Sequence, residues 1–134
     1  MSLSTPKRAA AVSKLVKQIN ADIDWSILPE LTDWVIDACV TIQQIPAPTF
    51  EEATRADHVA AQFTALDLQD VDIDDLYNVY GVMPGTHRDQ PGLMVAAHTD
   101  TVFSAETDLT ITRTADTING PGIGDNCLGV AGIL

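Results

Sequence analysis

One histidine and two aspartates have the types and the order that suggest chemistry. His98 and Asp100 directly follow the apolar run of residues 93–97, and Asp125 lies in a glycine-rich stretch, residues 120–126. Residues i and i+2 of an extended chain project to the same side, so His98 and Asp100 can point together from the carboxyl end of a strand. In open α/β sheets, ligands bind at that edge. The pattern predicts a functional site there.

The pairing of His98 with Asp100 suits a metal ligand. A neutral imidazole binds a metal ion through one nitrogen, and its other ring N–H needs a fixed acceptor, often a carboxylate. Asp100 is placed to be that acceptor, which makes His98 a candidate metal ligand. In the alternative interpretation His98 caps a core strand and Asp100 starts a turn, and an isolated His-x-Asp motif favours this alternative.

Asp125 strengthens the interpretation as a metal site. The glycines at positions 120, 122, 124 and 129 allow tight turns and close approach of the backbone. Asp125 is then expected at or near a helix N-cap, with its carboxylate free to face a neighbouring strand. A capping role alone would explain Asp125, but it explains less well why so many glycines surround it.

Three amphipathic helices are expected in the first half of the chain. Apolar residues at helical spacing predict a first helix around residues 12–19 and a second over about residues 29–45. Thr49 and Glu52 have the T-x-x-E spacing of a capping box, which predicts a third helix that runs to about Leu66.

Strands are expected after the helices. Residues 78–83, 93–97 and 109–112 have extended patterns separated by turn signals, and a loop over residues 117–126 leads into a last helix. These elements predict the α/β class. The sequence contains no repeat and no linker, so we expect residues 1–134 to form one domain.

The composition excludes several classes of partner. Seven Lys and Arg residues stand against 19 Asp and Glu, and the formal charge of -12 repels nucleic acids and anionic lipid surfaces. The sequence has neither an apolar run long enough for a membrane span nor the apolar core of a signal peptide, so a cytoplasmic protein is expected. Cys39 and Cys127 are far apart and indicate neither a disulfide framework nor a thiolate zinc site.

Two other motifs fail on inspection. Residues 70–75 have aspartates at the spacing of a calcium loop, but Asp75 and Gly81 occupy the positions of the required glycine and glutamate. A solvated strand edge or turn is the better interpretation. Residues 120–125 contain glycines, but they lack the register and the Lys-Ser/Thr pair of a phosphate-binding loop.

The stretches "HTDTV" (98–102) and "GPGIGDNCLGVAGIL" (120–134) resemble the paired signatures of a zinc exopeptidase and deacylase family. This family includes peptidase T, glutamate carboxypeptidase, aminoacylase and acetylornithine deacetylase. Residues 45–56 and 77–85 are similar to it in type and order, so the resemblance covers roughly residues 30–134. It implies the N-terminal part of a three-layer α/β/α catalytic domain, with helices first and then a mixed sheet.

The resemblance also implies a pair of zinc ions, for which cobalt or manganese could substitute. His98 would bind one ion, Asp125 would bridge both, and Asp100 would contribute to catalysis by orienting the His98 ring. The implied reaction is hydrolysis of a peptide or amide bond by a metal-activated water, and the implied substrate is a peptide or an N-acyl amino acid. His58 and His87 match no motif and are expected at the surface.

The sequence also departs from the family pattern. The family's general-base glutamate, its further ligands and its lid or dimerisation domain have no counterpart before Leu134, and Cys127 occupies a position that is commonly lysine. We expect Cys127 to affect packing, with a role as a soft ligand as the alternative. The chain would then be the N-terminal portion of a metallohydrolase domain, inactive or nearly so when isolated and able to self-associate through unpaired strand edges or apolar surface.

Two alternatives to an enzyme stay open. The chain could be a non-catalytic module that binds a single metal ion or a peptide weakly, or a structural remnant in which the three polar residues only cap and turn. Within the enzyme class, "PTFEE" and "HTDTV" look most like the peptide-cleaving branch. Aminopeptidase, carboxypeptidase, dipeptidase and N-deacylase activities are not distinguished.

Overall fold

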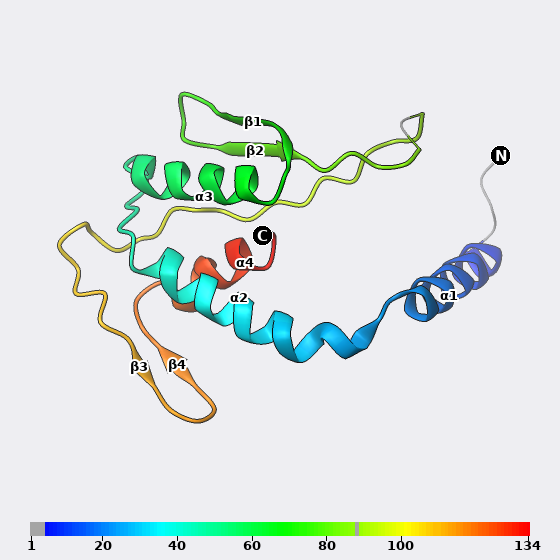
Figure 1. Cartoon of the computed structure of the whole chain (residues 1–134), viewed down its shortest axis with the longest axis horizontal. Coiled ribbons are helices and arrows are strands. Elements are labelled where there is room, and N and C mark those ends of the chain that lie inside the picture. Colours follow the sequence, from blue (N-terminus) through cyan, green and yellow to red (C-terminus); the bar gives the residue numbers. More distant parts are fainter. Residues whose placement is uncertain (1–4, 88) are drawn as a thin grey trace. The chain divides into compact units, whose positions relative to one another are not determined.

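The computed structural model describes residues 5–87 and 89–134. The chain forms two compact units, Met1–Thr32 and Asp33–Leu134 (Figure 1). Within the described ranges, no helix is both long enough and apolar enough to cross a membrane.

The first unit is helical. Helix α1 spans Thr5–Asp22 and confirms the first predicted helix, although its large apolar side chains are exposed, for example 56% of Leu15. The short helix η1, Trp25–Ile27, is capped by Asp24, whose carboxylate accepts a hydrogen bond from the Ser26 backbone N–H at 3.0 Å. Asx caps of this kind satisfy backbone donors that have no partner within the helix.

Helix α2, Leu28–Gln43, begins in the first unit and continues into the second. Pro29 lies in its first turn, as predicted, where a missing N–H costs nothing. The helix ends two residues before the predicted Ile45. Pro46 and Pro48 follow, and residues that precede proline disfavour the helical backbone.

Helix α3, Ala53–Ala65, confirms the third predicted helix, but the predicted capping box is wrong. Glu52 itself is the N-cap residue and makes no side-chain cap. Its carboxylate accepts a hydrogen bond from the Phe50 backbone N–H at 2.8 Å instead. Thr49 lies too far before the helix to cap it, and its hydroxyl donates to Asp100.

The strands form two antiparallel pairs, so the α/β class is confirmed. Strand β1 (Gln69–Ile73) pairs with β2 (Val79–Val82), which confirms the strand expected over residues 78–83. Strand β3 (Thr112–Arg113) pairs with β4 (Ile118–Asn119). Asp74 organises the turn between β1 and β2 by accepting hydrogen bonds from the backbone N–H groups of Leu76 and Asn78. The acidic stretch of residues 70–75 is therefore a strand and a turn, as the sequence indicates.

The predicted strand over residues 93–97 is wrong. A strand is defined by its pairing, and this stretch has no ladder partner in residues 5–87 and 89–134. The pairing that follows it is an isolated parallel bridge between Pro48 and Thr101. The strand predicted over residues 109–112 begins only at Thr112, because the Leu109 carbonyl accepts hydrogen bonds from the side-chain amides of Gln43 and Gln44 instead.

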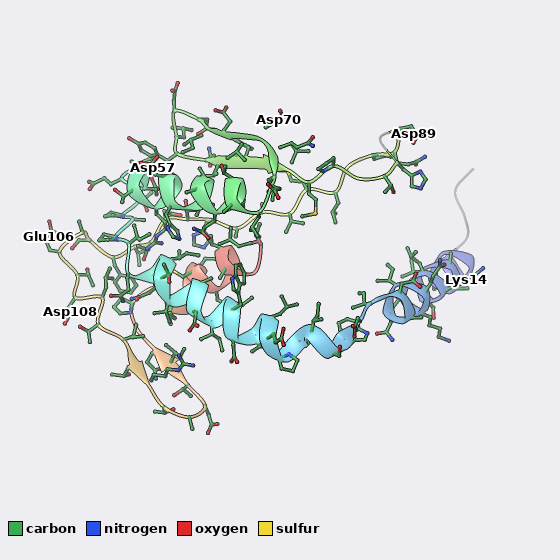
Figure 2. All side chains as sticks on the ribbon, in the orientation of Figure 1. Lys14, Asp57, Asp70, Asp89, Glu106 and Asp108 are labelled. Carbon is green, nitrogen blue, oxygen red and sulfur yellow. The ribbon has the colours of Figure 1, made fainter. Side chains whose placement is uncertain are left out.

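The core of the second unit lies between α2, α3 and the last helical turns. These turns are η2 (Ile123–Cys127) and α4 (Leu128–Ala131), which confirm a helical start at this point of the sequence. The buried cluster contains Cys39, Ile42, Val59, Phe63, Cys127, Val130 and Ala131. Cys127 is thus a packing residue, as expected. Charged side chains such as Asp57, Asp70 and Asp108 are exposed around this core (Figure 2).

Candidate metal site

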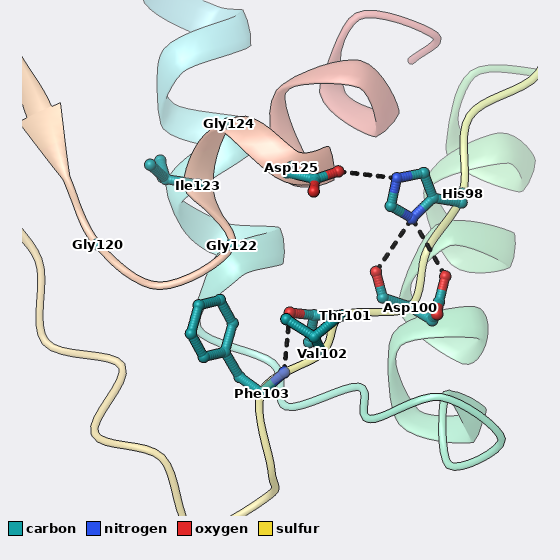
Figure 3. A pocket seen from close by; sticks show the side chains of 10 residues that line it. All are labelled: His98, Asp100, Thr101, Val102, Phe103, Gly120, Gly122, Ile123, Gly124 and Asp125. Atoms are coloured by element: carbon teal, nitrogen blue, oxygen red, sulfur yellow. Dashed lines mark hydrogen bonds and ion pairs between the residues drawn. The ribbon is translucent and has the colours of Figure 1, made fainter.

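The structure brings His98, Asp100 and Asp125 together, although they lie on two separate segments (Figure 3). His98 Nδ1 lies 3.1 Å from Asp100 Oδ1 and 3.2 Å from the Asp100 backbone oxygen. On the other side of the ring, His98 Nε2 lies 3.0 Å from Asp125 Oδ1. The ring is therefore held between two carboxylates, one at each nitrogen.

The segment that carries His98 and Asp100 is fixed by hydrogen bonds to the loop between α2 and α3. The Thr101 backbone N–H donates to the Ala47 carbonyl at 2.8 Å. Arg55, on α3, donates from Nη1 to the Thr99 carbonyl at 2.7 Å and from Nε to the Ile45 carbonyl at 3.0 Å. Only 2% of Arg55 is exposed, so these carbonyls and the guanidinium satisfy each other away from water.

Asp125 is near a helix N-cap, as predicted, but it is not the N-cap residue itself. The N-cap of α4 is Cys127, and Asp125 has a non-helical backbone with φ -130° and ψ 88°. The turn before it depends on Gly122, whose φ of +73° is costly for a residue with a side chain. Asn126 links this turn to the other segment, because its side-chain amide donates to the His98 carbonyl at 3.4 Å.

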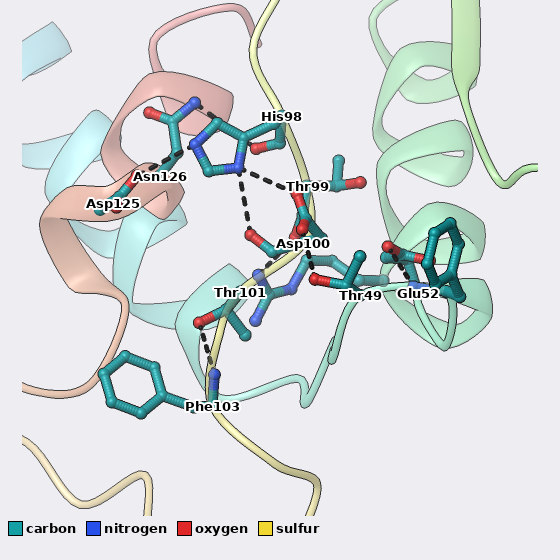
Figure 4. Close-up of polar contacts among 11 residues, drawn as sticks. Thr49, Glu52, His98, Thr99, Asp100, Thr101, Phe103, Asp125 and Asn126 are labelled. Carbon is teal, nitrogen blue, oxygen red and sulfur yellow. Dashed lines mark hydrogen bonds and ion pairs between the residues drawn. The ribbon is translucent and has the colours of Figure 1, made fainter.

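Two residues of the site were missed from the sequence. Thr49 donates a hydrogen bond from its hydroxyl to Asp100 Oδ2 at 2.7 Å (Figure 4). The sequence did mark the Thr49 hydroxyl, but as the acceptor of a local backbone N–H in a capping box, and not as a donor to Asp100. Arg55 could have been noticed because it lies beside Ala56 and Val59 on the buried face of α3, where a charged residue requires an explanation.

The electrostatics of the site favour ionised groups. The hydrogen bond from Thr49 lowers the pKa of Asp100 most, burial opposes it, and the contact with His98 lowers it further. Burial lowers the pKa of His98, but the hydrogen bonds to Asp100 and Asp125 together outweigh it, and the pKa is raised. A metal ion at His98 Nε2 has to compete with this proton.

An open cavity of about 340 Å³ adjoins these side chains. Besides the three polar residues, Thr101, Phe103 and Ile123 contribute to its walls (Figure 3). None of the residues described around this cavity is Lys or Arg. Its polar end is therefore acidic, and its other walls are mainly apolar.

The donor set fits a zinc ion in part. Imidazole nitrogen and carboxylate oxygen are zinc ligands at about 2.0–2.2 Å, so the 3.0 Å between His98 Nε2 and Asp125 Oδ1 is close to the spacing of two ligands of one ion. In residues 5–87 and 89–134, no group of three or more His, Cys, Asp or Glu side chains is arranged to hold a metal ion. The site thus offers two candidate ligands, with Asp100 behind the ring.

The other histidines lie away from these ligands. His87 is exposed, as expected, whereas His58 is half-buried. His58 lines a separate cavity of about 250 Å³ together with Trp34, Gln62 and Leu134. Neither histidine lines the cavity beside His98.

Residues 78–134 match the model of Peptidase family M28. The matched region contains His98, Asp100 and Asp125, and the match supports a peptidase of the zinc exopeptidase type at the level of the superfamily. It does not extend to peptidase T, glutamate carboxypeptidase, aminoacylase or acetylornithine deacetylase, so a relation to these enzymes stays a prediction. None of the curated proteins matches the chain.

Proposed function

We propose that this chain carries part of the metal site for zinc-dependent hydrolysis of a peptide bond, with His98 and Asp125 as ligands and Asp100 as the carboxylate that positions His98. The observation that carries the proposal is the 3.0 Å approach of His98 Nε2 to Asp125 Oδ1 within the region matched by the peptidase family. An isolated histidine or a capping aspartate would not require this convergence.

The residues of the chain have separable roles in this proposal. When bound, zinc would polarise the scissile carbonyl and activate a water molecule. His98 is competent as a ligand when its proton is on Nδ1 and is donated to Asp100, because Nε2 then has a free lone pair. Asp125, whose side chain is 91% exposed, has the carboxylate oxygens needed to bridge two ions.

We propose that the isolated chain does not turn over substrate. A general base has to lie within hydrogen-bond reach of the activated water. The buried Glu52 does not line the cavity, and its Oε1 is occupied by the Phe50 backbone N–H. The base and the further ligands would belong to a longer parent protein, of which this chain is the N-terminal portion of the catalytic domain.

We propose a peptide as the substrate, because residues 48–52 and 98–102 look most like the peptide-cleaving branch of the family that the sequence resembles. In this proposal Asp100 and Asp125 serve His98 and the metal ion, and the apolar walls of the cavity are left to face the substrate. A cytoplasmic location remains the expectation from the sequence.

Calorimetric titration with Zn²⁺ tests the metal site. We expect micromolar or tighter binding to the full chain and its loss in both His98→Ala and Asp125→Ala. His87→Ala and Asp116→Ala are matched controls, because both residues are exposed and lie outside the cavity. Equal weak binding by all five proteins would contradict the proposal and favour capping and turning roles alone.

A second candidate function is single-metal binding without catalysis. The convergence of only two ligands in the part of the chain that the structure describes favours it. This candidate would be supported if zinc binding were lost in His98→Ala and Asp125→Ala and if no longer form of the protein had peptidase activity.

A further inference from the structure

We propose that Thr49 is a positioning residue of the site: its hydroxyl fixes the Asp100 carboxylate so that His98 keeps its proton on Nδ1 and leaves Nε2 free for a ligand. The proposal deepens the proposed function and rests on it for the role of Nε2. It assigns a task to a residue from the loop before α3, outside the two motifs that contain His98 and Asp125.

The two oxygens of Asp100 have different partners. Thr49 donates to Oδ2 at 2.7 Å, while Oδ1 lies 3.1 Å from His98 Nδ1. A carboxylate that is hydrogen-bonded at only one oxygen can rotate about its Cβ–Cγ bond, but two partners on opposite oxygens restrict that rotation. The hydroxyl of Thr49 thus determines where the carboxylate acceptor for Nδ1–H lies, beside the Asp100 backbone oxygen, which is 3.2 Å from Nδ1 (Figure 4).

Thr49 is itself held in place by its loop. Both ends of the short stretch from Ile45 to Pro48 are tied to the segment of His98: Arg55 joins the carbonyls of Ile45 and Thr99, and the Ala47 carbonyl accepts the Thr101 N–H. The Glu51 backbone N–H closes the loop by donating to the Pro48 carbonyl at 2.8 Å. Because Arg55 and Ala47 are buried, water cannot easily replace these bonds.

The restraint on the Asp100 carboxylate matters because Asp125 lies at the other ring nitrogen of His98. It offers His98 a second carboxylate, 3.0 Å from Nε2, and an imidazole with one proton can donate it to either aspartate. Donation to Asp125 would place the proton on the nitrogen that has to bind the metal ion. Fixing Asp100 therefore favours the tautomer that is competent to bind.

The test compares Thr49→Val, which keeps the shape but removes the hydroxyl, with Thr49→Ser, which retains the donor. Thr64→Val is the control, since the Thr64 hydroxyl donates to the Ala60 carbonyl on α3. The first readout is the tautomer of His98 in the metal-free chain, from proton–nitrogen NMR correlation spectra at a pH where the ring is neutral. The second is zinc affinity by calorimetry, and thermal unfolding checks that each variant is folded.

We expect the wild type, Thr49→Ser and Thr64→Val to show mainly the Nδ1–H form. In Thr49→Val the population should shift towards Nε2–H, and zinc affinity should fall about ten-fold or more, as for other residues that orient metal ligands. The same tautomer in Thr49→Val as in Thr49→Ser would overturn the proposal. If His98→Ala left zinc binding unchanged, the metal site would fail, whereas the tautomer would still report on Thr49 alone.

Discussion

Gly122 sets the direction of the chain just before Asp125. Its φ of +73° lies in the left-handed region, and a Cβ at this position would also approach the Thr101 hydroxyl to 3.4 Å. Gly124, two residues later, faces open space, because a Cβ added there would meet nothing within 4 Å. Substituting each of these glycines in turn therefore separates the effect of the left-handed backbone at Gly122 from the effect of simply replacing a glycine.

We expect Gly122→Ala to lower the free energy of unfolding by about 1–2 kcal/mol, because an L-residue is strained in the left-handed conformation. The displaced turn should also weaken zinc binding through Asp125. Gly124→Ala should leave both quantities nearly unchanged. Urea unfolding and calorimetry of the two variants measure these effects, and equal losses in both would contradict the assigned role of Gly122.

At the residue scale, the pairing of His98 with Asp100 could be predicted because it depends only on residues that are close in the sequence. The two-residue periodicity of an extended chain brings the side chains of His98 and Asp100 together without any knowledge of the fold. The partner of Thr49 could not be predicted in this way, since it lies 51 positions away in the sequence. A local motif, the capping box, competed for the same hydroxyl and gave the wrong answer.

At the scale of the elements, α2 contributes a buried thiol to the contact with the turn before α4. The Cys39 thiol donates to the Ile123 carbonyl at 3.4 Å, and burial, followed by the nearby Cys127, raises the pKa of Cys39 to about 11. A raised pKa means that the folded chain holds this proton more tightly than the unfolded chain does. The resulting stabilisation is complete below the ordinary thiol pKa and is lost as the pH rises through about 11.

We therefore expect the free energy of unfolding to fall by up to about 3 kcal/mol between the ordinary thiol pKa and the raised one. In Cys39→Ala the dependence should be smaller, and the part that comes from Cys127, whose pKa is also raised by burial, should remain. Urea denaturation at a series of alkaline pH values checks this expectation. A wild type and a variant with the same slope would show that Cys39 does not titrate with folding.

The helices were easier to predict than the strands for a physical reason. The backbone hydrogen bonds of α2 and α3 close within each helix, so the apolar spacing and the prolines after α2 are sufficient signals. A strand needs a second segment. Residues 93–97 have an apolar extended pattern but no partner in the part of the chain that the structure describes, and the pattern alone cannot supply one.

At the scale of the whole molecule, exposed apolar side chains favour self-association and the net charge opposes it. Leu93 and Met94 are 90% and 81% exposed, and they lie in a stretch whose backbone has no ladder partner among the described residues. Unpaired extended backbone with apolar side chains favours pairing with another chain. The net charge of -12 repels a second copy, and salt screens this repulsion.

We expect the chain to self-associate through residues 93–97, and more strongly as salt is added. Met94→Lys places a charge in the stretch and should reduce association, whereas Leu15→Lys, which makes the same change in net charge at an exposed position on α1, should not. Sedimentation velocity over a range of protein and salt concentrations measures the effect. A monomeric wild type under all these conditions would contradict the expectation.

The link between Arg55 and the carbonyls of Ile45 and Thr99 has a consequence for local opening of the chain. Together with the bond from the Thr101 N–H to Ala47, it joins the loop before α3 to the segment of His98. Partial unfolding of either segment would break the same bonds and expose the same amides to exchange with solvent. A ligand held by His98 would have to leave in that event, so its lifetime is limited by how often this buried link opens.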